Sequence, residues 1–123
     1  MAAPNIITAT SILGKSTAVS LTTTAATSVV SNAASSGHVY KVNTLNVANS
    51  SASATTISIS YYNAAALGGT AFFIVGTVSV PAYATLNVID KTGQYYLEEN
   101  TSIGATANIA SNLMVTCSYE DIN

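Results

Sequence analysis

Charged side chains are scarce in this sequence. Three lysines, no arginine, five carboxylates and one histidine leave 7% of the 123 residues charged, whereas folded soluble domains carry about 25%. Acid–base catalysis, metal binding and phosphate binding all draw on these residue types. The composition therefore argues against an enzyme, and we expect neither a cofactor nor a metal ion.

The few basic residues do not form a cluster. Lys15, Lys41 and Lys91 lie far apart in the sequence, so no basic surface for nucleic acid is expected. The longest strongly apolar stretch, Ala71 to Val75, is far shorter than the roughly 20 residues of a membrane-spanning helix. We expect a protein that binds neither nucleic acid nor membrane.

Two further absences bear on where the chain is made. The first lysine is at position 15, so the sequence does not open with the basic segment of a secretory signal. A single cysteine, Cys117, cannot form a disulfide within the chain, which agrees with a reducing compartment. Both observations favour synthesis and folding in a cytoplasm without export.

What the chain does contain favours β-strands. It is 49% apolar with a net charge of −2, a balance typical of folded chains, and it is rich in Val, Ile, Thr and Tyr, which suit a pleated sheet. Period-two alternation and turn residues predict strands at 56–62, 72–80, 85–90, 94–97 and 113–120. Gly76 predicts a bulge within the second of these.

Weaker patterns predict further strands at 5–11, 17–22, 27–31 and 39–48. The last needs a bulge near Asn43, because its apolar residues change parity there. Residues 102–110 contain mostly small residues, and the pattern does not decide between strand and loop. The total predicts one antiparallel β-sandwich domain over residues 1–123 with eight or nine short strands, either immunoglobulin-like or a jelly roll. Residues 1–11 are a candidate extended N-terminal arm or edge strand.

Three local features invite a chemical interpretation. Gly14-Lys15-Ser16-Thr17 resembles the end of a phosphate-binding loop, but the first glycine of that motif is replaced by Ala9 and no helix pattern follows, so we interpret it as a turn between strands. His38, beside Gly37, lacks a second histidine for a metal site and is expected at a loop edge. Cys117 alternates with core residues, which predicts a buried, unreactive thiol.

Adjacent acidic residues offer a possible calcium site. Glu98, Glu99 and Asn100 could offer oxygen ligands in a tight loop. Neighbouring residues on a strand point to opposite faces, and solvated turn charges are the commoner role of such pairs. We therefore expect no catalytic, cofactor-binding or metal-binding residues.

Aromatic residues at outward strand positions point instead to a protein partner. Strand parity places one member of each tyrosine pair, Tyr61-Tyr62 and Tyr95-Tyr96, on the outer face. Exposed apolar surface often marks a protein–protein interface, and the alternative is that a second sheet covers these residues. The candidate interface residues are Ile6, Ile7, Tyr62, Phe73 and Tyr96.

Several short segments resemble the small virion proteins of tailed marine phages such as cyanophages. They are Met1 to Ile6, Gly14-Lys15, Lys41 to Leu45, Val80 to Ala82, Tyr96 to Glu99 and Cys117 to Ile122. The resemblance implies a non-enzymatic structural protein of the virion, most simply a capsid decoration or cement protein. Its partners would be the major capsid protein or other virion proteins.

The same resemblance leaves the position in the particle open. A head decoration protein is expected to be a homo-oligomer, with a trimer at local threefold positions as the simplest arrangement. A neck, tail or fibre component is the alternative, with host-surface or carbohydrate binding through Tyr62, Tyr96 and asparagine side chains.

Overall fold

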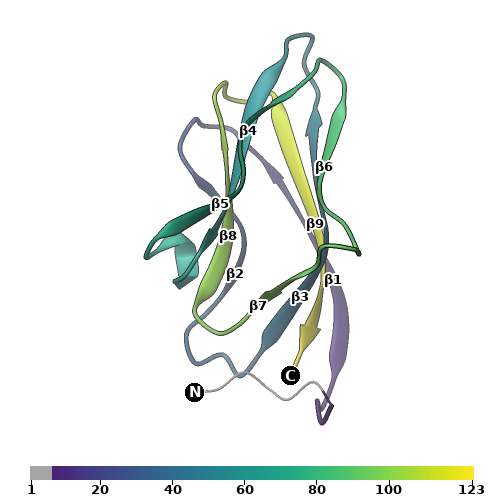
Figure 1. Ribbon diagram of the computed structural model, residues 1–123, viewed down its shortest axis with the longest axis vertical. Helices are drawn as coiled ribbons and strands as arrows, with labels where there is room; N and C mark the ends of the chain where they lie inside the picture. Colours follow the sequence, from purple (N-terminus) through teal and green to yellow (C-terminus); the bar gives the residue numbers. More distant parts are fainter. Residues whose placement is uncertain (1–6) are drawn as a thin grey trace.

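The computed structural model describes residues 7–123, which form two antiparallel sheets packed face to face (Figure 1). The first sheet contains β1 (Ile12–Ser20), β9 (Leu113–Ile122), β3 (Val39–Asn49) and, one after the other along the far side of β3, β6 (Thr85–Ile89) and β7 (Tyr95–Leu97). The second contains β2 (Thr27–Asn32), β8 (Thr101–Ala107), β4 (Thr55–Tyr62) and β5 (Ala71–Val80). The predicted all-β sandwich is confirmed.

The strand order selects the jelly roll from the two predicted topologies. The sheets run β1-β9-β3-β6 and β2-β8-β4-β5, and β7 shares the position of β6 because both pair with β3. The first strand thus pairs with the last, the second with the last but one, and so on inward to β4 and β5. This nested pairing is that of a jelly roll, whereas an immunoglobulin-like domain would place its first, second, fourth and fifth strands in one sheet.

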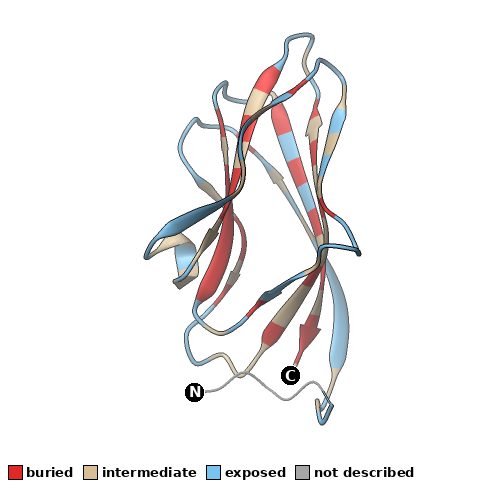
Figure 2. Ribbon diagram, in the orientation of Figure 1, coloured by how far each residue is buried: buried red, intermediate tan, exposed pale blue. Residues whose placement is uncertain are grey.

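The core lies between the two sheets and follows the period of two expected of strands with one wet face (Figure 2). Buried and more exposed residues alternate along β9, for example, from Leu113 to Tyr119. The largest fully buried side chains are Leu21, Val42, Leu45, Val47, Ile57, Ile59, Val80, Ile89, Leu97, Ile103, Leu113 and Val115. Cys117 is also buried among them, as predicted.

The strand that the sequence pattern did not resolve, β8, is the most buried element of the molecule. Its residues are small because both of its faces are covered: one faces the core, and the short 3₁₀ turn η1 (Ala65–Leu67) lies over the other. At Gly104, a Cβ atom would come within 2.6 Å of Leu67 Cδ2 and 3.0 Å of Tyr62 Cε1. A strand covered on both faces has no alternation of apolar and polar residues, and this explains why its pattern was uninformative.

Both predicted bulges are present. In β3 the pairing with β9 skips Asn43. In β5 the residues Gly76 and Thr77 stand opposite one residue of β4, Ser58, whose hydroxyl accepts a hydrogen bond from Thr77 N at 2.9 Å. The extra residue of each bulge shifts the side chains that follow to the opposite face.

Two predictions near the N-terminus are wrong. Residues 7–11 of the predicted strand 5–11 form a turn and bends rather than a strand; residues 1–6 of the candidate arm lie outside the described residues. The predicted turn at Gly14 to Thr17 lies inside β1, because β9 offers a continuous partner for nine residues. The predicted strand 17–22 is the second half of this longer strand.

Two buried asparagines connect the sheets. At the end of β2, Asn32 Nδ2 donates to Leu97 O in β7 at 3.0 Å and to His38 O at 2.9 Å. At the end of β3, Asn49 Nδ2 donates to Val80 O in β5 at 3.0 Å and to Ser53 O at 2.8 Å. Each amide therefore satisfies one buried carbonyl group of the opposite sheet and one of a connecting segment, and an unpaired buried carbonyl is costly.

We expect Asn32→Ala and Asn49→Ala each to lower the free energy of unfolding by about 2 kcal/mol, because each leaves buried carbonyl groups unpaired. Urea denaturation followed by circular dichroism measures this loss. Asn87→Ala is the matched control, since Asn87 is exposed on β6 and its replacement should cost well under 1 kcal/mol. Equal stabilities of the three variants would show that the amides do not hold the sheets together.

Candidate functional site

Three polar side chains, Lys15, His38 and Asp121, meet at one end of the first sheet. Asp121, near the end of β9, is 1% exposed. Its Oδ2 atom accepts a hydrogen bond from Lys15 Nζ in β1 at 2.8 Å, and its Oδ1 atom lies 2.5 Å from His38 Nδ1, just before β3. Asp121 thus ties the two strands that flank β9 to the strand between them.

The carboxyl group of Asp121 is ionised in the folded protein. Burial raises its pKa. Hydrogen bonds and Coulombic interactions with Lys15 and His38 lower the pKa by more than burial raises it, so the pKa lies below its ordinary value of 3.8. An Asp–His pair orients the imidazole in many hydrolases, but such a site also needs a nucleophile on the second ring nitrogen. Within residues 7–123, no hydroxyl group makes a hydrogen bond to the His38 ring. The contacts shown for this cluster join β1, the residue before β3 and β9.

The other chemical candidates are the cysteine and the acidic residues. Burial raises the pKa of the Cys117 thiol to about 11, which keeps it protonated and unreactive at neutral pH. Among residues 7–123, no three histidine, cysteine, aspartate or glutamate side chains gather in a way that could hold a metal ion. No helix within residues 7–123 is long and apolar enough to cross a membrane.

The three aromatic residues of the candidate interface are divided between the two sheets. Tyr62 and Phe73 belong to β4 and β5 of the second sheet, whereas Tyr96 belongs to β7 of the first. Tyr62 is half-buried over Gly104, while Phe73 is 73% exposed. Ile7 is exposed, and Ile6 lies outside the described residues. The tyrosines therefore do not form one stacking surface.

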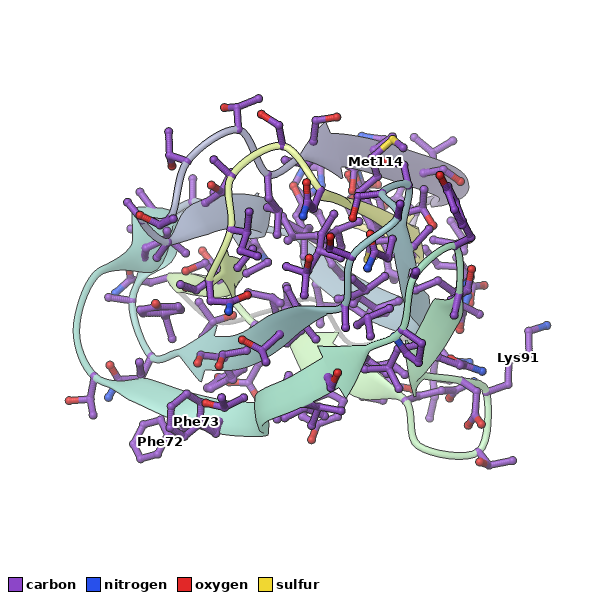
Figure 3. The ribbon with its side chains drawn as sticks, turned by 90° about the horizontal axis from the view of Figure 1, so that it is seen from above. Phe72, Phe73, Lys91 and Met114 are labelled. Carbon is purple, nitrogen blue, oxygen red and sulfur yellow. The ribbon has the colours of Figure 1, made fainter. Side chains whose placement is uncertain are left out.

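Exposed apolar side chains occur on both sheets. Phe72 and Phe73 project from β5, and Met114 projects from the other sheet, on the opposite side of the molecule in Figure 3. A shallow hollow of about 170 Å³ lies beside Met114, between β1 and β9. Its other lining residues include Ala18, Ser20 and Thr116. The side chains that line this hollow on the first sheet carry no charge.

The four edges of the two sheets differ in how they are protected. An edge strand has unpaired backbone groups that attract other strands, and bulges, interruptions and charges commonly block it. β2 has a bulge at Val29. β5 has bulges at Ile74 and at Gly76. The edge of the first sheet beyond β3 is formed by β6 and β7. It has a bulge at Val88, and a turn at 90–93 that contains Lys91 interrupts it.

The remaining edge, β1, has neither a bulge nor an interruption. It pairs with β9 through nine consecutive residues without a register shift, and it contains no proline. Its one charged residue, Lys15, is bound to Asp121, so its charge is neutralised by the neighbouring strand. β1 is therefore an open, regular strand edge.

Hydrogen bonds at both ends of β1 show which of its backbone groups are free. Ser11 and Asn123 exchange two hydrogen bonds of 3.0 Å, and Leu21 N donates to Leu113 O at 3.0 Å. Hydrogen-bonded residues alternate along an antiparallel pair, and the register between these ends is unbroken. The odd-numbered residues therefore bond to β9. The N–H and C=O groups that face away from the sheet belong to Ile12, Gly14, Ser16, Ala18 and Ser20, all of which are exposed.

Sequence reasoning missed this edge and the cluster beside it. The sequence pattern predicts a turn at 14–17 and a strand at 17–22, where the structure has one strand. Lys15 resembles the lysine of a phosphate-binding loop, but it binds Asp121. One signal was available: residues 12–20 contain neither proline nor an acidic residue, which suits a regular strand. The partner of Lys15 could not be inferred, because Asp121 is 106 residues away in the sequence.

Comparisons with known proteins give one informative likeness. No family model matches the chain, and no curated protein matches its sequence. Among solved structures, it is similar to a protein of Bacillus endospore appendages, described as a novel family of disulfide-linked pili, with a TM-score of 0.50. The two are 12% identical over 91% of this chain and 88% of that one. This likeness concerns the fold.

The buried Asp121 makes stability depend on pH. Because its pKa is lower in the folded than in the unfolded chain, it stabilises the fold above its ordinary pKa, and this contribution is lost as the pH falls through the folded pKa. We expect Asp121→Asn to lower stability at neutral pH and to flatten the decline of stability below about pH 4. Urea denaturation at a series of pH values measures both effects.

The control for this prediction is Glu98→Gln, which removes a carboxylate from an exposed position. It should leave the acid decline as steep as in the wild type. If Asp121→Asn declines as steeply as the wild type in acid, the ion pairs of Asp121 do not stabilise the fold.

Proposed function

We propose that this chain is a non-enzymatic structural subunit of an assembly that contains many copies of it. The observation that carries this proposal is the β1 edge, with nine regular residues and no blocking device. A protein that stays monomeric is expected to block such an edge, since it invites pairing with other chains. The scarcity of charge works in the same direction, because copies with few charges repel one another weakly.

The chemistry of the described residues supports the non-enzymatic part. The imidazole of His38 binds a buried carboxylate that Lys15 also neutralises, and the Cys117 thiol is buried. A catalytic group must reach a substrate from a site where its protonation state suits the reaction. The buried Cys117 thiol does not reach a substrate, and no nucleophile among residues 7–123 makes a hydrogen bond to the His38 ring.

The finer proposal is a capsid decoration or cement protein of a tailed phage. The short sequence segments that resemble small virion proteins of marine phages support it, and jelly rolls occur in many viral capsid proteins, although a fold alone does not determine function. Its partners would be the major capsid protein and further copies of itself, and its location would be the virion. Many weak contacts on a repeated lattice add up to stable attachment.

A filament subunit is the second candidate, supported by the likeness to the appendage protein of the disulfide-linked pili. Linking each subunit to two neighbours by disulfides requires at least two cysteines. This sequence has one, which is buried. A filament of this chain would therefore rest on non-covalent contacts. Carbohydrate binding through Tyr62 and Tyr96 has no comparable support, since the two residues lie on different sheets.

Quantitative mass spectrometry of gradient-purified particles from the source lysate tests the finer proposal. We expect this chain in amounts comparable to the major capsid protein, because a decoration protein occupies every equivalent lattice position. A few copies per particle would place it at the neck, tail or a unique vertex. Absence from particles, together with filaments of the pure protein in electron micrographs, would favour the second candidate.

A further inference from the structure

We propose that β1 pairs with β1 of a second copy of this chain. The two strands would run antiparallel about a twofold axis at Ser16, so that the first sheets of both copies join into one continuous sheet. This inference rests on the proposed function and names the surface through which two subunits meet. Pairing of one edge strand with another is a common mode of recognition, in which the backbone supplies most of the affinity.

The free backbone groups of the edge match those of a second copy. Antiparallel strands exchange hydrogen bonds between residues whose N–H and C=O groups both face the partner. Those residues are the even-numbered ones in β1, as the bonds of Ser11 and Leu21 to the far end of the hairpin show. Centring the pair on Ser16 places every even residue opposite another even residue. The edge is therefore complementary to itself.

The length of the edge selects this register. Centring on Ser16 pairs all nine residues of β1, and the pairs are Ile12 with Ser20, Leu13 with Val19, Gly14 with Ala18, Lys15 with Thr17, and Ser16 with itself. Moving the centre to Lys15 or to Thr17 would pair seven residues instead of nine. In the Ser16 register, Gly14 and Ala18 flank Ser16 on the outer face, and Leu13 meets Val19 on the inner face.

The same chain offers no comparable partner strand among its described residues. The edges formed by β2, β5 and β6 each contain a bulge, and β7 has three residues. A bulge breaks the spacing of hydrogen bonds along an edge, so none of these strands can match nine regular residues. A second β1 can. Because Lys15 is neutralised by Asp121 in each copy, two such edges also approach without repulsion.

The contact is twofold, and a closed trimer cannot be built from it, because a twofold interface uses the same surface on both subunits. This distinguishes it from the threefold arrangement expected for a decoration protein. Assembly beyond the pair would use other surfaces, such as the exposed Phe72 and Phe73 on the second sheet.

Disulfide trapping tests the pairing and its register in the full chain. Hydrogen-bonded antiparallel residues have Cα atoms about 5.5 Å apart, which lies within the range that a disulfide spans. Mild oxidation of Ser16→Cys should therefore give a covalent dimer on a non-reducing gel. Ser20→Cys alone should not, but mixed with Ile12→Cys it should. The native Cys117 is buried and does not interfere.

Thr116→Cys is the matched control for trapping, because it makes the same hydroxyl-to-thiol change on the same exposed face but on β9, one strand inside the edge. It should stay monomeric. Equal trapping of Thr116→Cys and Ser16→Cys would reflect random collisions and overturn the proposed register.

Sedimentation equilibrium of the unmodified chain and of Ser16→Pro tests the pairing without a cross-link. The wild type should reach twice its mass of 12.5 kDa as its concentration rises. Ser16→Pro should stay monomeric over that range with an unchanged melting temperature, because its lost N–H faces away from β9 and proline is tolerated there. Ser16→Thr, which keeps the N–H, should dimerise like the wild type.

The outcomes separate this inference from the proposed function. If the wild type and Ser16→Pro dimerise equally, or if the wild type has the mass of a trimer, β1 pairing is overturned. The proposal of a structural subunit would stay in place. A monomeric wild type whose attachment to particles is lost in Ser16→Pro would assign the edge to a different protein and overturn the second copy as its occupant. Dimers that Ser16→Pro abolishes, in a chain absent from any particle or filament, would support the pairing and contradict the proposed function.

Discussion

Every strand at the rim of an open β-sheet has a row of backbone N–H and C=O groups that the sheet itself does not pair. A jelly roll built from two open sheets has four such rims, and the rest of this structure can be understood from how each is treated. Bulges interrupt β2, β5 and β6, and a turn with charged residues separates β6 from β7. Only the β1 rim stays regular over its full length among the described strands. The fold thus combines three edges that are interrupted by bulges with one edge that is regular.

The low charge of the chain changes how its interior and surface are held together. Amide and hydroxyl groups do the work that ion pairs do elsewhere, and Asn32 and Asn49 join the sheets through backbone carbonyl groups. Neutral hydrogen bonds of this kind are satisfied without the large desolvation cost of buried charges. The exception is Asp121, whose two partners, Lys15 and His38, lie in β1 and just before β3. The carboxylate therefore fixes the end of β1 that begins the open edge.

The sequence predicted the elements whose pattern reflects one buried and one solvated face. β3, β4, β6 and β9 fall within two residues of their predicted limits, and the bulge at Asn43 follows from a change of parity that the sequence displays. β8 escaped prediction because η1 covers the face that would otherwise be polar. β1 escaped because it is exposed on most of its residues, so no apolar alternation marks it.

Long-range contacts set the limit for the candidate site. The exposure of Phe73 followed from its outward position, but the separation of Tyr62 from Tyr96 depended on which strand joined which sheet. The link from Lys15 to Asp121 depended on the pairing of the first strand with the last. An open edge is a property of the sheet order, and a local pattern in the sequence does not contain that order.

Amide hydrogen exchange along β1 tests the central claim most directly, because it reports the state of each backbone N–H group in the intact protein. In dilute, monomeric protein, the account predicts slow exchange at Leu13, Thr17 and Val19 and fast exchange at Gly14, Ser16 and Ala18. In the assembled protein, it predicts slow exchange at all six. Fast exchange of the even-numbered amides in the assembly would contradict it, because the β1 edge would then still be open to water.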